Sequence, residues 1–186
     1  MIFLRHGQSE FNVVYSVTRR DPGIRDPKLT EEGRRQAKAA AGTLRDAGIE
    51  ALVASPYTRA LETAEIVAGE LGLPVTVEPL VGERVAFACD LGSAPSELRA
   101  RWPHLALDHL DEQWWPPPEE SEASLRHRCE RFRALITQWA HWRRVAIVTH
   151  WGFIRGFTGL AVANGALVRV DPHRPELEPE TLAPIN

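Results

Sequence analysis

Short apolar runs alternate with longer amphipathic segments along most of the chain. Four of these runs predict buried strands: IFL at 2–4, ALVASP at 51–56, a short run at 75–77 and RRVAIVTH at 143–150. Segments with helical character lie between and after them. Because strands that alternate with helices form sheets covered by helices, the pattern predicts an α/β fold with a mostly parallel sheet and helices on both faces.

The ends of the predicted helices carry local signals. Ser9 is expected to cap a first helix, and Thr30 followed by two glutamates predicts the start of a second, with Gly48 as its stop. The other expected elements are a helix opened by Ser55 and Pro56 with proline at its first position, a helix from Ser121 to about Trp142, a helix over WGFIRGFTGLAVANG at 151–165 and an edge strand over GALVRVDP at 165–172.

Residues 79–120 form the one long irregular segment, in which Gly, Pro and Trp are frequent. Segments of this kind are usually lids or disordered, and the WWPPPE run favours a packed lid. Trp114 and Trp115 are interpreted as an anchor for this lid, with a wall of a substrate pocket as the alternative. We therefore expect one domain over residues 1–186 with a lid insertion at 79–120.

Composition restricts the classes of partner. The chain has 186 residues, of which 44% are hydrophobic and 25% charged, and its net charge is −3. This balance gives no support for binding to nucleic acid or to an anionic membrane, and no apolar run is long enough to span a bilayer. Cys89 and Cys129 form no metal-ligand or redox spacing and imply no disulfide framework. The expected setting is soluble and cytoplasmic.

Cationic and nucleophilic side chains follow three of the predicted strands. The first strand ends in Arg5 and His6, the second is followed by Arg59 one turn into its helix, and the strongest ends in His150. In a doubly wound sheet, ligands bind beyond the carboxyl ends of the strands. Two histidines and two arginines at one rim would repel one another unless an anion joins them. The sequence therefore predicts a local anion site.

A phosphoryl group is the anion that this set of side chains fits best. Two guanidinium groups offer bidentate hydrogen bonds to its oxygens, and helix N-termini add backbone donors. Transfer of the group also needs a nucleophile, and a neutral imidazole nitrogen can serve. His6 is the better candidate, because Gly7 behind it allows a tight turn of the backbone.

Five stretches resemble the histidine phosphatase superfamily, which has the phosphoglycerate-mutase-like fold. They are RHG at 5–7, DPKLTEEGRRQA at 26–37, SPYTRALETA at 55–64, PEESEASLRHRCERF at 118–132 and VTHWGF at 148–153. The resemblance covers roughly residues 1–160. RHG alone is a weak motif, whereas the ordered set is specific.

The resemblance implies a role for individual residues. His6 would take the phosphoryl group as a phosphohistidine, while Arg5, Arg59 and His150 hold its oxygens. Two further residues are implied: Asn12 would contact phosphate or substrate, and Glu83 is assigned as the general acid. The alternative for Glu83 is a surface carboxylate paired with Arg84. Trp151 stands where the family commonly has a small residue, so it either contacts substrate or packs in the core. The remaining histidines and serines are expected to be solvated or to cap helices: His104, His109, His127, His141, His173, Ser9 and Ser55.

The predicted function is hydrolysis of small phosphomonoesters through the phosphohistidine, with no metal and no cofactor. A second candidate is a mutase that moves phosphate within a sugar acid. It is less favoured because a mutase must shelter its phosphohistidine from water and the 79–120 insertion is small. Dephosphorylation of a phosphoprotein and phosphate binding without catalysis are two further candidate functions. The sequence assigns no oligomeric state.

Overall fold

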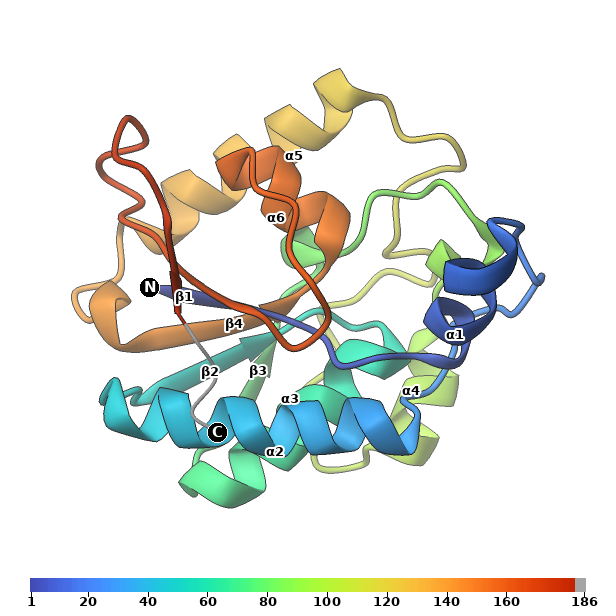
Figure 1. Ribbon diagram of the computed structural model, residues 1–186, viewed down its shortest axis with the longest axis horizontal. Coiled ribbons are helices and arrows are strands. Elements are labelled where there is room, and N and C mark those ends of the chain that lie inside the picture. The colour runs from blue at the N-terminus through green and yellow to red at the C-terminus, as the bar shows by residue number, and fades with distance from the viewer. Residues whose placement is uncertain (183–186) are drawn as a thin grey trace.

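The computed structural model describes residues 1–182 and contains a single mixed sheet (Figure 1). Its strands within that range are β1 (Ile2–Arg5), β2 (Ala51–Ala54), β3 (Val75–Val77), β4 (Val145–Thr149), β5 (Leu167–Arg169) and β6 (Glu180–Leu182). They lie in the order β3-β2-β4-β1-β5-β6. The first four pair in parallel, whereas β5 is antiparallel to β1 and β6 to β5. The predicted α/β fold with a mostly parallel sheet is confirmed.

Helices cover both faces of the sheet, as the sequence predicts (Figure 1). The α-helices are α1 (Glu10–Thr18), α2 (Glu31–Asp46), α3 (Thr58–Leu71), α4 (Pro95–Arg101), α5 (Glu122–Ile136) and α6 (Trp151–Thr158). One apolar cluster joins α2 and α3 to the sheet through Ile2 and Leu4 of β1. A second joins α5 and α6 to the opposite face through Phe3. The alternation along β1 thus fixes which side each of its residues faces.

Most of the predicted helix boundaries are confirmed. Ser9 caps α1 in a capping box with Asn12, and Thr30 caps α2 through the amide of Gly33. Gly48 follows α2 with φ +68°, a conformation that favours glycine. Pro56 is not the first helical residue, because α3 begins at Thr58.

The start of α3 depends on a contact that sequence spacing does not reveal. Both the amide and the hydroxyl of Thr58 donate to the carboxylate of Asp26, at 2.9 and 2.6 Å. Tyr57 is therefore the extended residue before the helix, and Ser55 does not cap it. The expectation that Ser55 is a helix cap was wrong.

Three other predictions differ from the structure. The helix after β4 ends at Thr158, where Gly159 adopts φ +78°, and α5 ends at Ile136 rather than near Trp142. The 165–172 run is not an edge strand, because β6 from the proline-rich tail pairs with β5 and takes the edge. The apolar residues of β5 are explained by packing on the two faces of the sheet, where Leu167 joins the cluster of α2 and α3 and Val168 the cluster of α5 and α6.

The segment 79–120 has more regular structure than the sequence suggests. It contains two short 3₁₀ helices, η1 (Pro79–Val81) and η2 (Ala88–Asp90), and helix α4. Its apolar residues join the cluster of α2 and α3 through Leu98, Trp102, Leu105, Leu107 and Leu110. The division into one domain with a lid stays a prediction.

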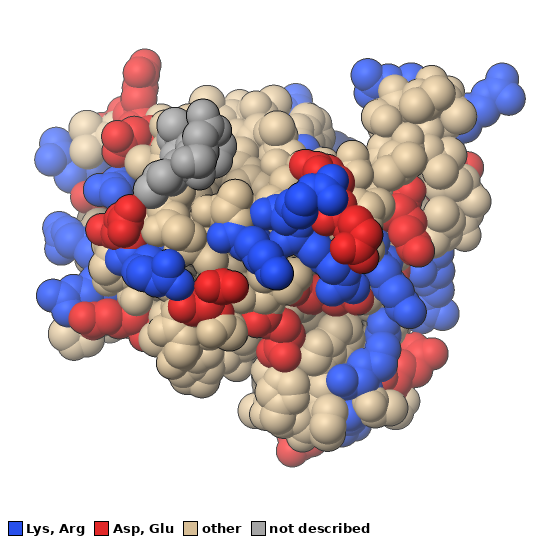
Figure 2. All heavy atoms as spheres, turned by 60° about the horizontal axis from the view of Figure 1, so that its bottom comes forward, with Lys and Arg blue, Asp and Glu red and all other residues tan. Residues whose placement is uncertain are grey.

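Charged side chains of both signs are interspersed on the face that Figure 2 shows, and neither sign gathers there in one patch. Within residues 1–182, no helix is both long and apolar enough to cross a membrane. The cytoplasmic location and the lack of nucleic-acid and membrane partners stay predictions.

Candidate active site

The two histidines meet because β1 and β4 are neighbours in register. Arg5 pairs with Thr149, so His6 and His150 each follow one member of that pair, and the amide of His6 donates to the Thr149 carbonyl at 2.9 Å. Their ring centroids are 5.1 Å apart, and both side chains are buried. The convergence expected at the ends of parallel strands is therefore present.

The hydrogen bond of His6 defines which ring nitrogen is free. Nδ1 lies 2.7 Å from the Gly7 carbonyl, which can only accept, so Nδ1 carries the hydrogen. Burial, followed by the charges of Arg59 and Arg5, lowers the pKa of His6 well below its ordinary value. The ring is therefore neutral near pH 7, with a lone pair on Nε2. This is the protonation state that a nucleophilic imidazole requires.

Gly7 is needed for a close approach of two backbones. A side chain there would collide with the carbonyl of Gly33 in α2, and a side chain on Gly33 would collide with the carbonyl of Gln8. The amide of Gly7 donates to the hydroxyl of Thr63 in α3, at 3.1 Å. The turn after His6 is thus packed directly against the helices beneath the sheet.

His150 presents a second neutral ring to the same place. Its Nε2 lies 2.8 Å from the hydroxyl oxygen of Ser55, whereas its buried Nδ1 has no partner within residues 1–182. Burial and the charge of Arg59 lower its pKa well below the ordinary value. If Ser55 donates to Nε2, Nδ1 carries the hydrogen and can donate it to an anion.

The two arginines are held by backbone carbonyls. Arg5 donates through Nη1 to the Val162 carbonyl at 2.6 Å, and its Nε is buried without a partner in the described chain. Burial lowers the pKa of Arg5 to about 10. Arg59, only 3% exposed, donates to the Cys89 carbonyl at 2.7 Å. Free N–H groups next to two neutral imidazoles form a site for an anion with several oxygens.

Asp90 also belongs to this site, and sequence reasoning missed it. Its Oδ1 accepts from Nη2 of Arg59 at 3.1 Å, and its Oδ2 accepts from the amides of Ala86 and Phe87 at 3.0 Å. The carboxylate is almost fully buried. Its contact with Nη2 fixes the orientation of the Arg59 guanidinium. One aspartate in an irregular segment, 31 residues from its partner, leaves no spacing signal in the sequence.

Glu83 lies at the same end of the sheet. Its Oε1 accepts from the amides of Arg84 and Gly152, both at 2.8 Å, and Gly152 is in the first turn of α6. Burial, together with the charge of Asp90, raises the pKa of Glu83 to about 7, against the opposing effect of Arg59. A carboxyl group with such a pKa can donate a proton near neutral pH.

The alternative for Glu83, a surface carboxylate paired with Arg84, does not match this geometry. The guanidinium of Arg84 instead contacts the carboxylate of Glu122 and the carbonyl of Glu120. The role of Glu83 as general acid stays a prediction.

Asn12 contacts the site through a residue that the sequence did not single out. Its Oδ1 accepts from Ser9 in the capping box and from Nδ2 of Asn164 at 3.1 Å. The same Nδ2 lies 3.1 Å from the His6 carbonyl. The side chain of Asn12 therefore helps to hold the backbone of His6 through Asn164, and its contact with phosphate stays a prediction.

The tryptophans divide into two kinds. Trp151, the first residue of α6, is 38% exposed and lies beneath Arg155, so its interpretation as core packing was wrong. Trp114 donates to the Ser93 carbonyl and its ring lies 4.6 Å from Tyr57, which in turn lies 5.0 Å from His150. These contacts match the interpretation of Trp114 as an anchor of the 79–120 segment.

The five other histidines are exposed, as expected: His104, His109, His127, His141 and His173.

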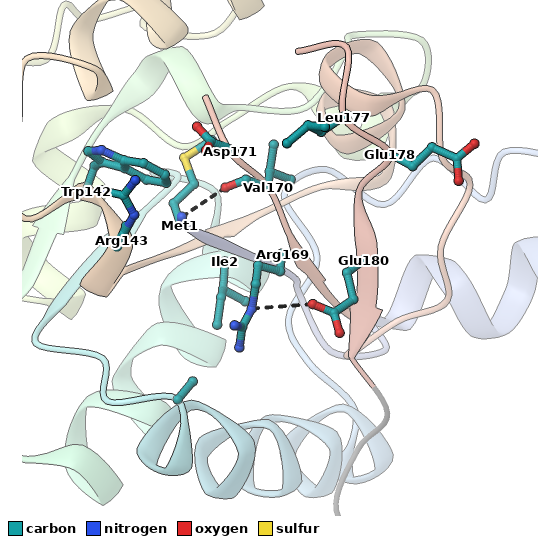
Figure 3. Close-up of a pocket in the computed structure, with 11 residues that line it drawn as sticks. Met1, Ile2, Trp142, Arg143, Arg169, Val170, Asp171, Leu177, Glu178 and Glu180 are labelled. Atoms are coloured by element: carbon teal, nitrogen blue, oxygen red, sulfur yellow. Dashed lines mark hydrogen bonds and ion pairs between the residues drawn. The ribbon is translucent and has the colours of Figure 1, made fainter. Parts of the chain in front are cut away.

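A cavity of about 340 Å³ lies at the other end of β1 and is distinct from this site. Figure 3 shows side chains around it from the C-terminal end of β5 and the residues that follow, and from the tail, including the ion pair of Arg169 with Glu180. Met1 and Trp142 also line it. Acidic and basic groups neutralise one another there, so the cavity offers no concentrated charge for an anion.

Comparisons with known proteins identify a family and several relatives. The family model described as histidine phosphatase superfamily (branch 1) matches residues 1–171. A glucosyl-3-phosphoglycerate phosphatase from Mycolicibacterium vanbaalenii is 32% identical over 176 residues, covering 88% of this chain and 76% of that protein. A 2,3-bisphosphoglycerate-dependent phosphoglycerate mutase from a Methylobacterium species is 30% identical over 165 residues, covering 83% of this chain and 76% of the mutase.

A bifunctional protein from Mycobacterium tuberculosis is 36% identical over 168 residues, covering 89% of this chain. The chain spans only 45% of the length of that relative. Among solved structures, a mycobacterial glucosyl-3-phosphoglycerate phosphatase in complex with VO3 matches with a TM-score of 0.65 and 25% identity. That match covers 97% of this chain and 96% of the phosphatase.

Proposed function

Because the chain belongs to the histidine phosphatase superfamily (branch 1), we propose that it hydrolyses small phosphomonoesters through a phosphohistidine on His6. The observation that carries the proposal is the 2.7 Å contact of His6 Nδ1 with the Gly7 carbonyl, which leaves Nε2 for phosphorus at a site where Arg5 Nε and His150 Nδ1 are buried without a partner in residues 1–182. Phosphoryl transfer requires mainly that a nucleophile is positioned and that the charge of the equatorial oxygens is stabilised. The site supplies both.

In the first half of the reaction, Nε2 of His6 attacks phosphorus. The bond from phosphorus to the ester oxygen breaks with its electron pair on oxygen, and the carboxyl group of Glu83 gives that oxygen a proton. Arg5, Arg59 and His150 donate hydrogen bonds to the three transferring oxygens. The products are a phosphohistidine, a free alcohol and the carboxylate of Glu83.

In the second half, that carboxylate accepts a proton from a water molecule, and the oxygen of the water attacks phosphorus. The bond between phosphorus and Nε2 breaks, and its electron pair returns to His6. Inorganic phosphate leaves, and Glu83 is again protonated. A single carboxyl group with a pKa near 7 suits both directions of proton transfer.

The relatives and the 79–120 segment support hydrolysis of a small molecule. One relative is named for dephosphorylating glucosyl-3-phosphoglycerate, which makes a phosphorylated sugar acid a substrate to test. Trp114 links the segment to Tyr57 beside His150, and partial cover of this kind favours a small substrate over a protein surface. The mutase remains the second candidate, because mutases are among the relatives.

We expect phosphate release to persist in the presence of a chelator. The guanidinium groups of Arg5 and Arg59 already supply the positive charge that a metal ion would bring to the phosphoryl oxygens, and the neutral ring of His150 adds a hydrogen-bond donor. Phosphate release should be measured over a panel of phosphomonoesters with EDTA present. The panel should contain 3-phosphoglycerate, whose isomerisation without phosphate release would favour the mutase. Complete loss of activity in EDTA would contradict the mechanism.

Asp90→Asn is expected to move the alkaline limb of the kcat/KM profile to lower pH. The negative charge of Asp90 helps to raise the pKa of Glu83, and Glu83 can act as an acid only below that pKa. An uncharged amide removes this effect, so Glu83 loses its proton earlier as the pH rises. The exposed Asp108, which pairs with Arg99, provides the control Asp108→Asn. If the alkaline limb of the kcat/KM profile lies at the same pH in Asp90→Asn as in wild type, the charge of Asp90 does not raise the pKa of Glu83.

A further inference from the structure

Arg128 of α5 binds the backbone of the turn that carries Glu83. Its Nη1 donates to the carbonyls of Leu80 and Gly82, at 2.8 and 2.7 Å. Its Nη2 lies 3.2 Å from the carbonyl of Glu83 itself. One guanidinium therefore binds three carbonyl groups within four residues of chain. The turn cannot shift without breaking several of these hydrogen bonds together.

The guanidinium is itself fixed by a buried carboxylate. Oε1 of Glu120 accepts from Nε of Arg128 at 3.1 Å, and Oε2 accepts from Nη2 at 2.7 Å. The two side chains are only 10% and 1% exposed. A bidentate pair of this kind fixes the plane as well as the position of the guanidinium. A buried ion pair adds little stability over packed apolar residues, so its value here lies in the geometry that it imposes.

The backbone of Glu120 binds the two residues that directly follow this turn, Arg84 and Val85. Its amide donates to the Val85 carbonyl at 3.1 Å, and its carbonyl accepts from Nε of Arg84 at 2.9 Å. Glu120 is the last residue of the 79–120 segment. The two ends of that segment are therefore joined to each other and to α5.

Neither Arg128 nor Glu120 contacts the carboxyl group of Glu83. Within residues 1–182, that group accepts from the amides of Arg84 and Gly152. The direction of the carboxyl group is thus set by α6 on one side, while the position of its backbone is set by α5 on the other. A displaced turn would pull Glu83 away from the amide of Gly152 and from the ester oxygen.

We propose that Arg128 and Glu120 are positioning residues for the general acid, and that they hold the 80–83 turn so that Glu83 reaches the leaving group. The inference rests on the proposed function, because it assigns Glu83 to that reaction. It adds a role for two residues that contact neither phosphate nor the nucleophile. Within residues 1–182, the hydrogen bonds of Arg128 go to Glu120 and to the 80–83 turn, so its contacts support proton donation and not phosphate binding directly.

The test is the dependence of kcat/KM on the leaving group in Arg128→Lys. Lysine keeps the charge but has a single amino group, so it cannot bind three carbonyls and a carboxylate together. We expect kcat/KM for an alkyl phosphate to fall by about 10- to 100-fold more than for p-nitrophenyl phosphate, the scale of misplaced catalytic groups. Glu120→Gln, which removes the ion pair but keeps the shape, should show the same selectivity to a smaller degree.

The matched control is Arg133→Lys. Arg133 is also in α5, and its guanidinium donates to the carbonyls of Pro172 and Phe157, away from the 80–83 turn. This variant should be less stable, but the ratio of its kcat/KM values for the two substrates should equal that of wild type. In a Glu83→Gln background, Arg128→Lys should no longer alter that ratio, because the group that it positions is absent.

If Arg128→Lys and Glu120→Gln lower kcat/KM equally for the alkyl phosphate and for p-nitrophenyl phosphate, the inference is overturned. The proposed function would still stand in that case, provided that Glu83→Gln lowers kcat/KM more for the alkyl phosphate. If Glu83→Gln itself is not selective, the acid assignment fails and the inference fails with it. Thermal unfolding of each variant distinguishes a displaced turn from an unfolded protein. If Arg128→Lys does not fold, the same comparison of kcat/KM is made with Glu120→Gln, alone and combined with Glu83→Gln, and tests the inference in its place.

Discussion

His6→Ala is expected to abolish phosphate release, with a fall in kcat on the order of 10⁶-fold, the scale seen when a catalytic nucleophile is removed. Alanine leaves no nitrogen to attack phosphorus, while Arg5, Arg59 and His150 still bind the anion. The variant should therefore keep its affinity for inorganic phosphate or vanadate. Binding without turnover would show that the site is assembled and that only the nucleophile is missing.

The measurement is phosphate release together with trapping of the intermediate. Wild type mixed with a ³²P-labelled phosphomonoester and quenched in alkali should carry label that is lost in acid, as a phosphoramidate bond requires. His6→Ala should carry none. His127→Ala, an exposed histidine on α5, is the control and should match wild type. Turnover by His6→Ala at the wild-type rate would exclude the mechanism.

Glu83→Gln is expected to lower kcat/KM for an alkyl phosphate by about 10²- to 10⁴-fold, the range typical of general acids. The leaving alkoxide is strongly basic and needs a proton, whereas p-nitrophenolate leaves readily without one. The effect on p-nitrophenyl phosphate should therefore be small. Glutamine can still accept from the amides of Arg84 and Gly152, so the fold of the turn should be kept.

The pH profile provides a second measure of the same residue. With the pKa of Glu83 at about 7, kcat/KM of wild type for the alkyl phosphate should fall as the pH rises through that value. The fall should be absent in Glu83→Gln. Because kcat/KM reports the steps up to formation of the phosphohistidine, slow hydrolysis of that intermediate does not obscure the result. Glu122→Gln, at the residue that pairs with Arg84, is the control. Equal losses on both substrates would reject the assignment of Glu83.

The strand ends account for most of what could be predicted about the site. Arg5 ends β1, while His6 and His150 directly follow β1 and β4, and those strands are recognisable from their apolar residues. Parallel neighbours in a sheet bring such ends together whatever the length of chain between them. Arg59 follows from the same rule, because α3 begins just after β2. Glu83 needed the resemblance to a family, since its segment is irregular.

The contacts that sequence reasoning missed each join a residue of an α-helix to a residue outside the α-helices and strands. Asp90 with Arg59 and Asn164 with Asn12 each join residues more than 30 positions apart, with no repeated spacing at either end. Asp26 moves the start of α3 past Pro56 in the same way. Tertiary hydrogen bonds here override local preferences, because a buried amide or carboxylate must find a partner wherever the fold places one.

The position of β1 within the sheet also determines when the site can form during synthesis. Strand β1, which His6 directly follows, spans residues 2–5, yet its two neighbours are residues 145–149 and 167–169. A ribosome adding about 5–20 residues per second needs on the order of ten seconds or more to make the chain between them. During that time the first strand of the sheet lacks both of its partners, and its apolar residues Ile2, Phe3 and Leu4 remain open to wrong contacts. Such long-range pairing slows folding and leaves the nascent chain exposed to aggregation.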